Sequence, residues 1–152
     1  MTLLSWRNAG WIRPHKSSPE EIRDLFLIVD RELKDAANTS ISADSRYYIA
    51  YNGALKLCAI LLFASGYRPE KGQGSHQRAI DSIRHILGDD RLPDIDYLHF
   101  CRGKRNTSAY DRAGVVSPEN VAELIKYTAG FRADVLSWLR QHHPELTTLL
   151  PR

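Results

Sequence analysis

The chain has 152 residues, a net charge of +3 and an isoelectric point of about 8.9. Hydrophobic residues make up 43% of it and charged residues 26%, which excludes a disordered or fibrous chain and fits one globular domain. The small positive charge does not by itself indicate nucleic-acid binding. We predict an N-terminal arm at 1–16, a helical bundle at 17–143 and a tail at 144–152.

The arm shows no helical period, but it carries Trp6 and Trp11. Indole side chains in a short arm pack on their own domain or on a partner, and both choices are open. The arm lacks the apolar run of a secretion signal. The longest apolar stretch, 54–66, contains Lys56 and is too short to span a bilayer. We therefore expect a cytoplasmic protein with no membrane partner.

Five segments with helical spacing of apolar residues follow, at about 19–37, 43–66, 76–87, 94–108 and 118–142. The second is apolar nearly all round, so it is expected at the centre of the fold. No segment alternates as a strand does. We predict an all-α protein, an antiparallel up-and-down bundle of four to five helices. Polar residues that can cap helix N-termini precede four segments: Ser18, Ser42 or Asp44, Ser75 and Ser117.

Two cysteines, Cys58 and Cys101, lie among apolar residues in the helical patterns. This placement is typical of buried free thiols in a reducing compartment. No cysteine, histidine or carboxylate spacing indicates a metal site. The stretch 72–74, Gly-Gln-Gly, lacks the lysine and the strand–helix setting of a phosphate loop. We expect no metal and no cofactor.

The fourth predicted helix changes character along one face. Ile95 and Leu98 begin an apolar stripe that continues, at helical spacing, through Arg102 and Arg105. A guanidinium on a face that should be buried is costly unless it has a partner. Arginine binds phosphate groups through two parallel hydrogen bonds, so an anionic ligand is one candidate partner.

Three blocks of sequence, in order and spacing, resemble the HEPN superfamily of small helical bundles. They are ADSRYYIAY at 43–51, GYRP at 66–69 with GSH at 74–76, and RNTSAYD at 105–111. The resemblance runs from about residue 17 to about residue 139. It implies a homodimer that acts with a nucleotidyltransferase-fold partner in a toxin–antitoxin-like or defence pair.

The ribonuclease signature of that superfamily is an arginine, a polar residue and, a few positions later, a histidine. Arg105 and Asn106 match the first two positions, and Tyr110 stands where the histidine is expected. The resemblance therefore implies binding of an RNA or nucleotide phosphate more directly than cleavage. The predicted catalytic positions are Arg105, Asn106 and Tyr110, with Asp111 beside them as a binding residue.

Other binding residues are predicted from their own positions. Arg102 shares a helix face with Arg105 and can support phosphate binding. His99 precedes Arg102 by about one turn, and His76 opens a predicted helix, so each can supply the missing base or simply pack at the surface.

Three tyrosines, Tyr47, Tyr48 and Tyr51, lie near the start of the second helix. Such a cluster either stacks a base or packs in the core with its hydroxyls near polar partners. We favour the core role, with Tyr48 as the binding candidate. Asp44 and Arg46 are expected in the same polar network.

Two other functions stay open. In a non-catalytic binding or scaffold module, Arg105 would pair with Asp111 or Asp96 and fix its helix to the bundle. In a nucleotide-binding subunit, the same arginine would serve the active site of a partner.

Overall fold

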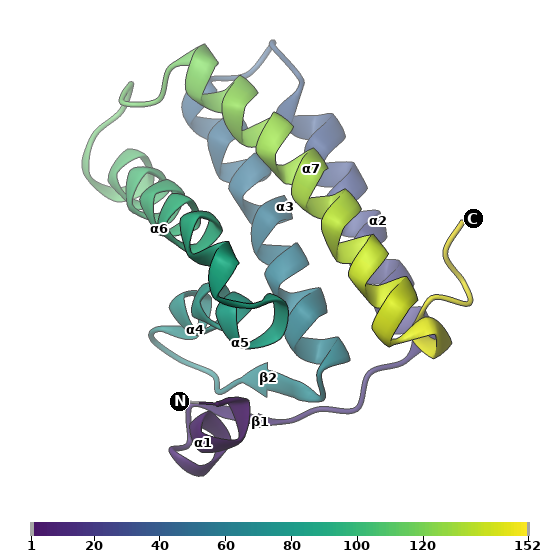
Figure 1. Cartoon of the computed structure of the whole chain (residues 1–152). Helices are drawn as coiled ribbons and strands as arrows, with labels where there is room; N and C mark the ends of the chain where they lie inside the picture. Colours follow the sequence, from purple (N-terminus) through teal and green to yellow (C-terminus); the bar gives the residue numbers. More distant parts are fainter. Residues whose placement is uncertain (1, 152) are drawn as a thin grey trace.

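The computed structural model describes residues 2–151 and is mostly helical (Figure 1). This confirms the predicted all-helical character, to which the structure adds a small two-stranded sheet that the sequence did not predict. The elements are α1 (Leu3–Asn8), β1 (Ile12–Pro14), α2 (Pro19–Ala36), α3 (Ala43–Ala64), β2 (Tyr67–Pro69), α4 (Ser75–Asp81), α5 (Ile83–Leu87), a 3₁₀ turn (Asp89–Arg91), α6 (Leu92–Asn106), a π-helical turn (Thr107–Asp111), α7 (Pro118–His142) and a second 3₁₀ turn (Pro144–Leu146).

Three of the predicted caps start long helices. The side chains of Ser18, Ser42 and Ser117 each accept a hydrogen bond from the backbone N–H three residues on, which satisfies a free donor of α2, α3 and α7. The prediction for Ser75 is wrong. Gly74 is the N-terminal cap of α4, with a φ of +90° that favours glycine, and Ser75 is already helical.

The helix α3 lies at the centre, as its all-round apolar sequence predicts. It packs against α2, α7, α6 and α4. Figure 1 shows α2 and α6 running opposite to α3, with α7 running alongside α3 in the same direction. At Gly53 the neighbouring helices come close, because an added Cβ would lie 3.4 Å from the Cβ of Glu32. The main core gathers apolar side chains from these helices, among them Phe26, Leu57, Leu61, Leu98, Phe131 and Val135.

By length and composition, α3 is the one helix within residues 2–151 that qualifies as a membrane span. Most of it is buried inside the protein, and a buried core helix meets the same criterion. Both cysteines, Cys58 on α3 and Cys101 on α6, are fully buried free thiols, as predicted.

The N-terminal arm is ordered, which the sequence did not predict. It contains α1, whose Thr2 and Ser5 form a reciprocal capping box, and β1, which pairs antiparallel with β2. Trp6 is only 5% exposed and packs with Ile12 and Leu62. The arm therefore docks on its own bundle, which answers the question that the two indoles left open.

The third predicted helix is divided in two. Ser82 separates α4 from α5, and its buried hydroxyl donates to the carbonyl of Ala79 over 2.7 Å. This local bond offers the backbone an alternative to a continuous helix. The division leaves α4 as a short segment between the arm and α6, where it forms one wall of the site described next.

Candidate functional site

On one face of α6, apolar side chains are followed by two arginines at the positions that the sequence predicts. Ile95 and Leu98 are buried, and Arg102 and Arg105 on the following turns are half-buried. Beyond Asn106 the helix widens into the π-helical turn, which ends where Arg112 becomes extended. Such wide turns are frequent at functional sites. Here the turn carries Tyr110, which is 76% exposed.

A pocket of about 670 Å³ lies between the end of α6 and the loop that leads into α4. It brings together six of the eight predicted site residues: Arg102, Arg105, Asn106, Tyr110, Asp111 and His76. The opposite wall is the stretch from Gly72 to Gln77, where Gly72 and Gly74 have positive φ angles. The stretch 72–74, to which the sequence assigns no role, is therefore part of the pocket wall.

Arg105 is held by aromatic rings and one amide. Its guanidinium carbon lies 4.4 Å from the ring centre of Tyr48 and 5.8 Å from that of Tyr110. One of its terminal nitrogens donates to the Asn106 side-chain oxygen over 2.8 Å. Its Nε is buried and has no hydrogen-bond partner within residues 2–151.

The expected structural pairs of Arg105 do not form. Over the described part of the chain, the guanidinium makes no ion pair with Asp111, Asp96 or any other carboxylate. Arg102 likewise makes no ion pair there, and its Nε is also buried without a partner. Two half-buried positive charges thus line the pocket without an ion pair, although Asp111 also lines it, and this favours an anion as their partner.

His76 lies in the same pocket and provides a group that RNA cleavage needs. Partial desolvation lowers its pKa from 6.5, and the positive charges of Arg105, Lys56 and Arg102 lower it further. The imidazole is therefore neutral near pH 7 and can accept a proton.

His99 is not brought to Arg105. Its Nε2 lies 2.6 Å from a carboxylate oxygen of Asp81, in a neighbouring hollow of about 650 Å³. Arg102 lines both hollows and connects them. Of the two candidate bases, His76 is the one that shares a pocket with Arg105.

The tyrosine cluster is divided between two roles. Tyr47 and Tyr51 are buried, and burial raises the pKa of both hydroxyls. Tyr48 is exposed, and the guanidinium of Arg105 lies over its ring. Tyr48 thus positions Arg105 from outside the pocket lining.

Asp44 and Arg46 do not join this network, which corrects the prediction. Asp44 accepts hydrogen bonds from the backbone of Gly114 and Val116 and so fixes the loop before α7. Arg46 donates to the carbonyl of Ala36 at the end of α2. Both residues therefore stabilise loops of the bundle.

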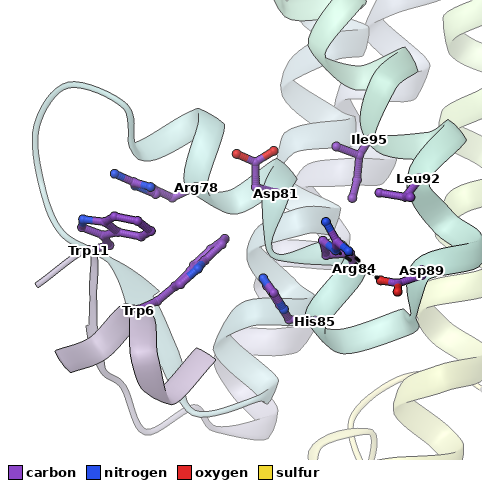
Figure 2. Close-up of a pocket in the computed structure, with 9 residues that line it drawn as sticks. All are labelled: Trp6, Trp11, Arg78, Asp81, Arg84, His85, Asp89, Leu92 and Ile95. Atoms are coloured by element: carbon purple, nitrogen blue, oxygen red, sulfur yellow. Dashed lines mark hydrogen bonds and ion pairs between the residues drawn. The ribbon is translucent and has the colours of Figure 1, made fainter. Parts of the chain in front are cut away.

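Sequence reasoning missed a third hollow, of about 560 Å³, beside the arm (Figure 2). It is lined by Trp6 and Trp11 of the arm together with Arg78 of α4, which lies over Trp11, and His85 of α5, which contacts Trp6. The two indoles of the arm could have indicated a binding surface. The hollow itself could not be predicted, because the other residues that line it, on α4 and α5, are distant in sequence.

Residues 2–151 contain no group of three histidine, cysteine or acidic side chains that could hold a metal ion. Comparisons with known protein families, with characterised proteins and with solved structures found no match for this chain.

Proposed function

We propose that this protein binds a phosphate group of RNA or of a nucleotide in the pocket between α6 and the α4 loop. The observation that carries the proposal is the pair of half-buried guanidinium groups, Arg102 and Arg105, which form no ion pair within residues 2–151 and whose Nε atoms are buried without a partner. Arginine presents a planar fork of donors that matches two phosphate oxygens. A bound phosphate would supply the missing negative charge.

The HEPN resemblance gives this site a biological setting. We propose a HEPN-like member of a toxin–antitoxin-like or defence pair, acting with a nucleotidyltransferase-fold partner. The packing of α3 against α2, α6 and α7 is compatible with the small helical bundle that the resemblance implies (Figure 1). Two exposed aromatic side chains, Phe100 of α6 and Tyr110 of the π-helical turn that follows it, suit a homodimer interface on this part of the protein. A nucleotidyltransferase-like neighbouring reading frame would support the pairing, and its absence would weaken it.

The binding test compares two arginines of one segment. Arg105→Ala should weaken binding of an RNA oligonucleotide by about 10- to 100-fold, because hydrogen bonds to a charged group are lost. Arg112→Ala removes the same charge from an exposed position outside the pocket lining and should leave affinity nearly unchanged. Calorimetric titration measures both, and thermal melting reports on folding.

The competing scaffold function makes a different prediction. If the wild-type protein binds neither RNA nor nucleotides, and Arg105→Ala lowers the melting temperature, then Arg105 is structural and the phosphate site is wrong. Equal losses of affinity in the Arg105 and Arg112 variants would also contradict the site, because general charge would then explain the binding.

RNA cleavage is a second candidate function, favoured by the neutral His76 in the pocket. His76 would accept the proton of a 2′-hydroxyl, whose oxygen forms a bond to the phosphorus while the bond to the 5′-oxygen breaks and that oxygen takes a proton from water. The two arginines would stabilise the charge that develops on the phosphate oxygens. If the protein cleaves RNA, His76→Ala should abolish cleavage and keep binding; full cleavage in that variant would exclude this role.

A further inference from the structure

We infer that the hollow beside the N-terminal arm holds a nucleobase, so that the protein binds a single-stranded nucleic acid along a groove over α4. This inference rests on the proposed phosphate site and adds to it a second subsite and a substrate longer than one nucleotide. Figure 2 shows this hollow, with Trp6 and Trp11 on one side and Leu92 and Ile95 on the other.

Shared lining residues link this hollow to the phosphate pocket through the middle hollow. Arg102 lines both the phosphate pocket and the middle hollow, and Arg78 lines both the middle hollow and the one beside the arm. One face of α4 thus connects Arg105 to Trp11. Each of the three hollows has a volume between 560 and 670 Å³, within the usual range of about 300–1,000 Å³ for ligand sites.

The hollow beside the arm is lined by planar groups. The guanidinium carbon of Arg78 lies 3.7 Å from the ring centre of Trp11, and Trp11 is only half-buried. Trp6 contacts Trp11 edge to face at 5.9 Å, and the imidazole of His85 lies 4.9 Å from Trp6. Aromatic rings and arginine planes are the surfaces on which unpaired bases stack.

The charge along the groove suits a phosphate backbone. The two carboxylates at its arm end are already engaged, since Asp81 contacts His99 and Asp89 pairs with Arg84. Arg78 makes no ion pair within residues 2–151, and in this it resembles Arg102 and Arg105. A positive groove with stacking groups at intervals is the usual arrangement for binding a single strand.

The hollow exists because the arm folds back. Trp11 is placed by β1, whose residues 12–14 pair with β2, and by the burial of Trp6 against Ile12. The arm thereby contributes a stacking group to a groove whose phosphate end is built by α6. The two indoles of the arm would then contribute to nucleobase binding as well as to packing.

The test measures affinity against strand length. Dissociation constants are determined for adenosine monophosphate and for oligoadenylates of increasing length, with wild-type protein, Trp11→Ala and Arg78→Ala. Wild-type affinity should rise once the strand reaches the arm. Both variants should lose about 5- to 100-fold in affinity for the longer strands and bind the mononucleotide as the wild type does.

Two controls keep the outcome clear. Trp11→Phe keeps a stacking ring and should retain most of the affinity. Trp138→Phe changes the indole that packs against His142 and His143 at the end of α7, and should have no effect. If Trp11→Ala melts at a lower temperature, Arg78→Ala decides the matter, because it keeps both indoles and the β1–β2 pairing of the arm.

The result can also separate this inference from the phosphate site. Equal wild-type affinity for the mononucleotide and for long strands would overturn the nucleobase subsite and leave the phosphate site standing. Absence of binding to every probe would overturn both. Length-dependent affinity that survives in both the Trp11→Ala and Arg78→Ala variants would place the strand elsewhere and overturn the groove.

Discussion

Arg105 and Arg132 both lie over aromatic rings, but within residues 2–151 only Arg132 of these two has a carboxylate counter-ion. Arg132 of α7 lies 5.1 Å from the ring centre of Phe26 and bonds both carboxylate oxygens of Asp30 on α2, over 2.7 and 3.1 Å. Arg105 of α6 lies 4.4 Å from the ring centre of Tyr48, and its polar partner is the neutral amide of Asn106.

This difference is the basis on which we propose that Arg105 binds a ligand, whereas Arg132 has a structural role. Stacking on a ring is common to both residues, so packing alone does not separate a structural arginine from a binding one. The ion pair across α2 and α7 neutralises Arg132 and links two helices. Arg105 lacks such a pair and has a buried Nε without a partner in residues 2–151. An external anion can therefore pair with its guanidinium.

The largest expected effect comes from giving Arg105 an internal counter-ion. Asn106→Asp would place a carboxylate where an amide oxygen now accepts from Arg105 over 2.8 Å. RNA affinity should fall by about 10- to 100-fold, because the new charge both occupies the guanidinium and repels phosphate. Calorimetric titration gives the affinity, and urea unfolding should show a free energy of unfolding higher by up to about 1 kcal/mol.

Asn106→Ala is the matched control for this substitution. It removes the amide without adding charge, so it should weaken binding far less than Asn106→Asp does. If the two variants bind RNA equally well, the counter-ion does not explain the difference between Arg105 and Arg132.

The reverse experiment removes the counter-ion that Arg132 has. Asp30→Asn keeps the shape of the side chain and should lower the free energy of unfolding by about 1 kcal/mol, since the pair is bidentate but partly exposed. RNA affinity should not change, because α2 and α7 do not line the groove. Denaturant unfolding and titration of one sample check both expectations. A loss of RNA affinity in this variant would show that the two arginines are not independent.

The sequence predicts the features that depend on neighbouring residues. Cap residues such as Ser18 and Ser117 mark helix starts because they satisfy donors three residues away. The change from Leu98 to Arg102 on one face of α6 is also visible in the sequence, because the two residues lie about one helical turn apart. It marks the position of the candidate site. These signals depend only on nearby residues, and the structure contains the features that they predict.

Features that join distant segments could not be predicted in this way. The strands β1 and β2 are three residues long, each contains a proline, and they pair across more than fifty residues of chain. The selection of His76 over His99 depends on where α4 lies against α6, because both histidines look equivalent in sequence. The pairing of Trp11 with Arg78 is of the same kind.

The smallest expected effect concerns His76, a titratable side chain that lines the same pocket as Arg105. Its pKa is lowered from 6.5 by partial desolvation and by Arg105, Lys56 and Arg102. The unfolded chain therefore binds a proton more readily than the folded one, so the free energy of unfolding falls as pH drops through about 6.5 and below. The pKa of His85 is lowered as well, and it contributes in the same direction.

Affinity should change with pH in the opposite direction. A phosphodiester bound beside Arg105 offsets the charges that depress the pKa of His76, so protonation becomes easier in the complex and binding tightens by a few-fold between about pH 7.5 and about pH 5.5. An oligouridylate is the suitable probe, because its bases do not titrate in this range. His76→Gln should flatten the affinity profile while part of the loss of stability persists through His85. A rise in affinity that survives in His76→Gln would mean that the bound phosphate does not lie near this histidine, and the pocket would then be defined by the arginines alone.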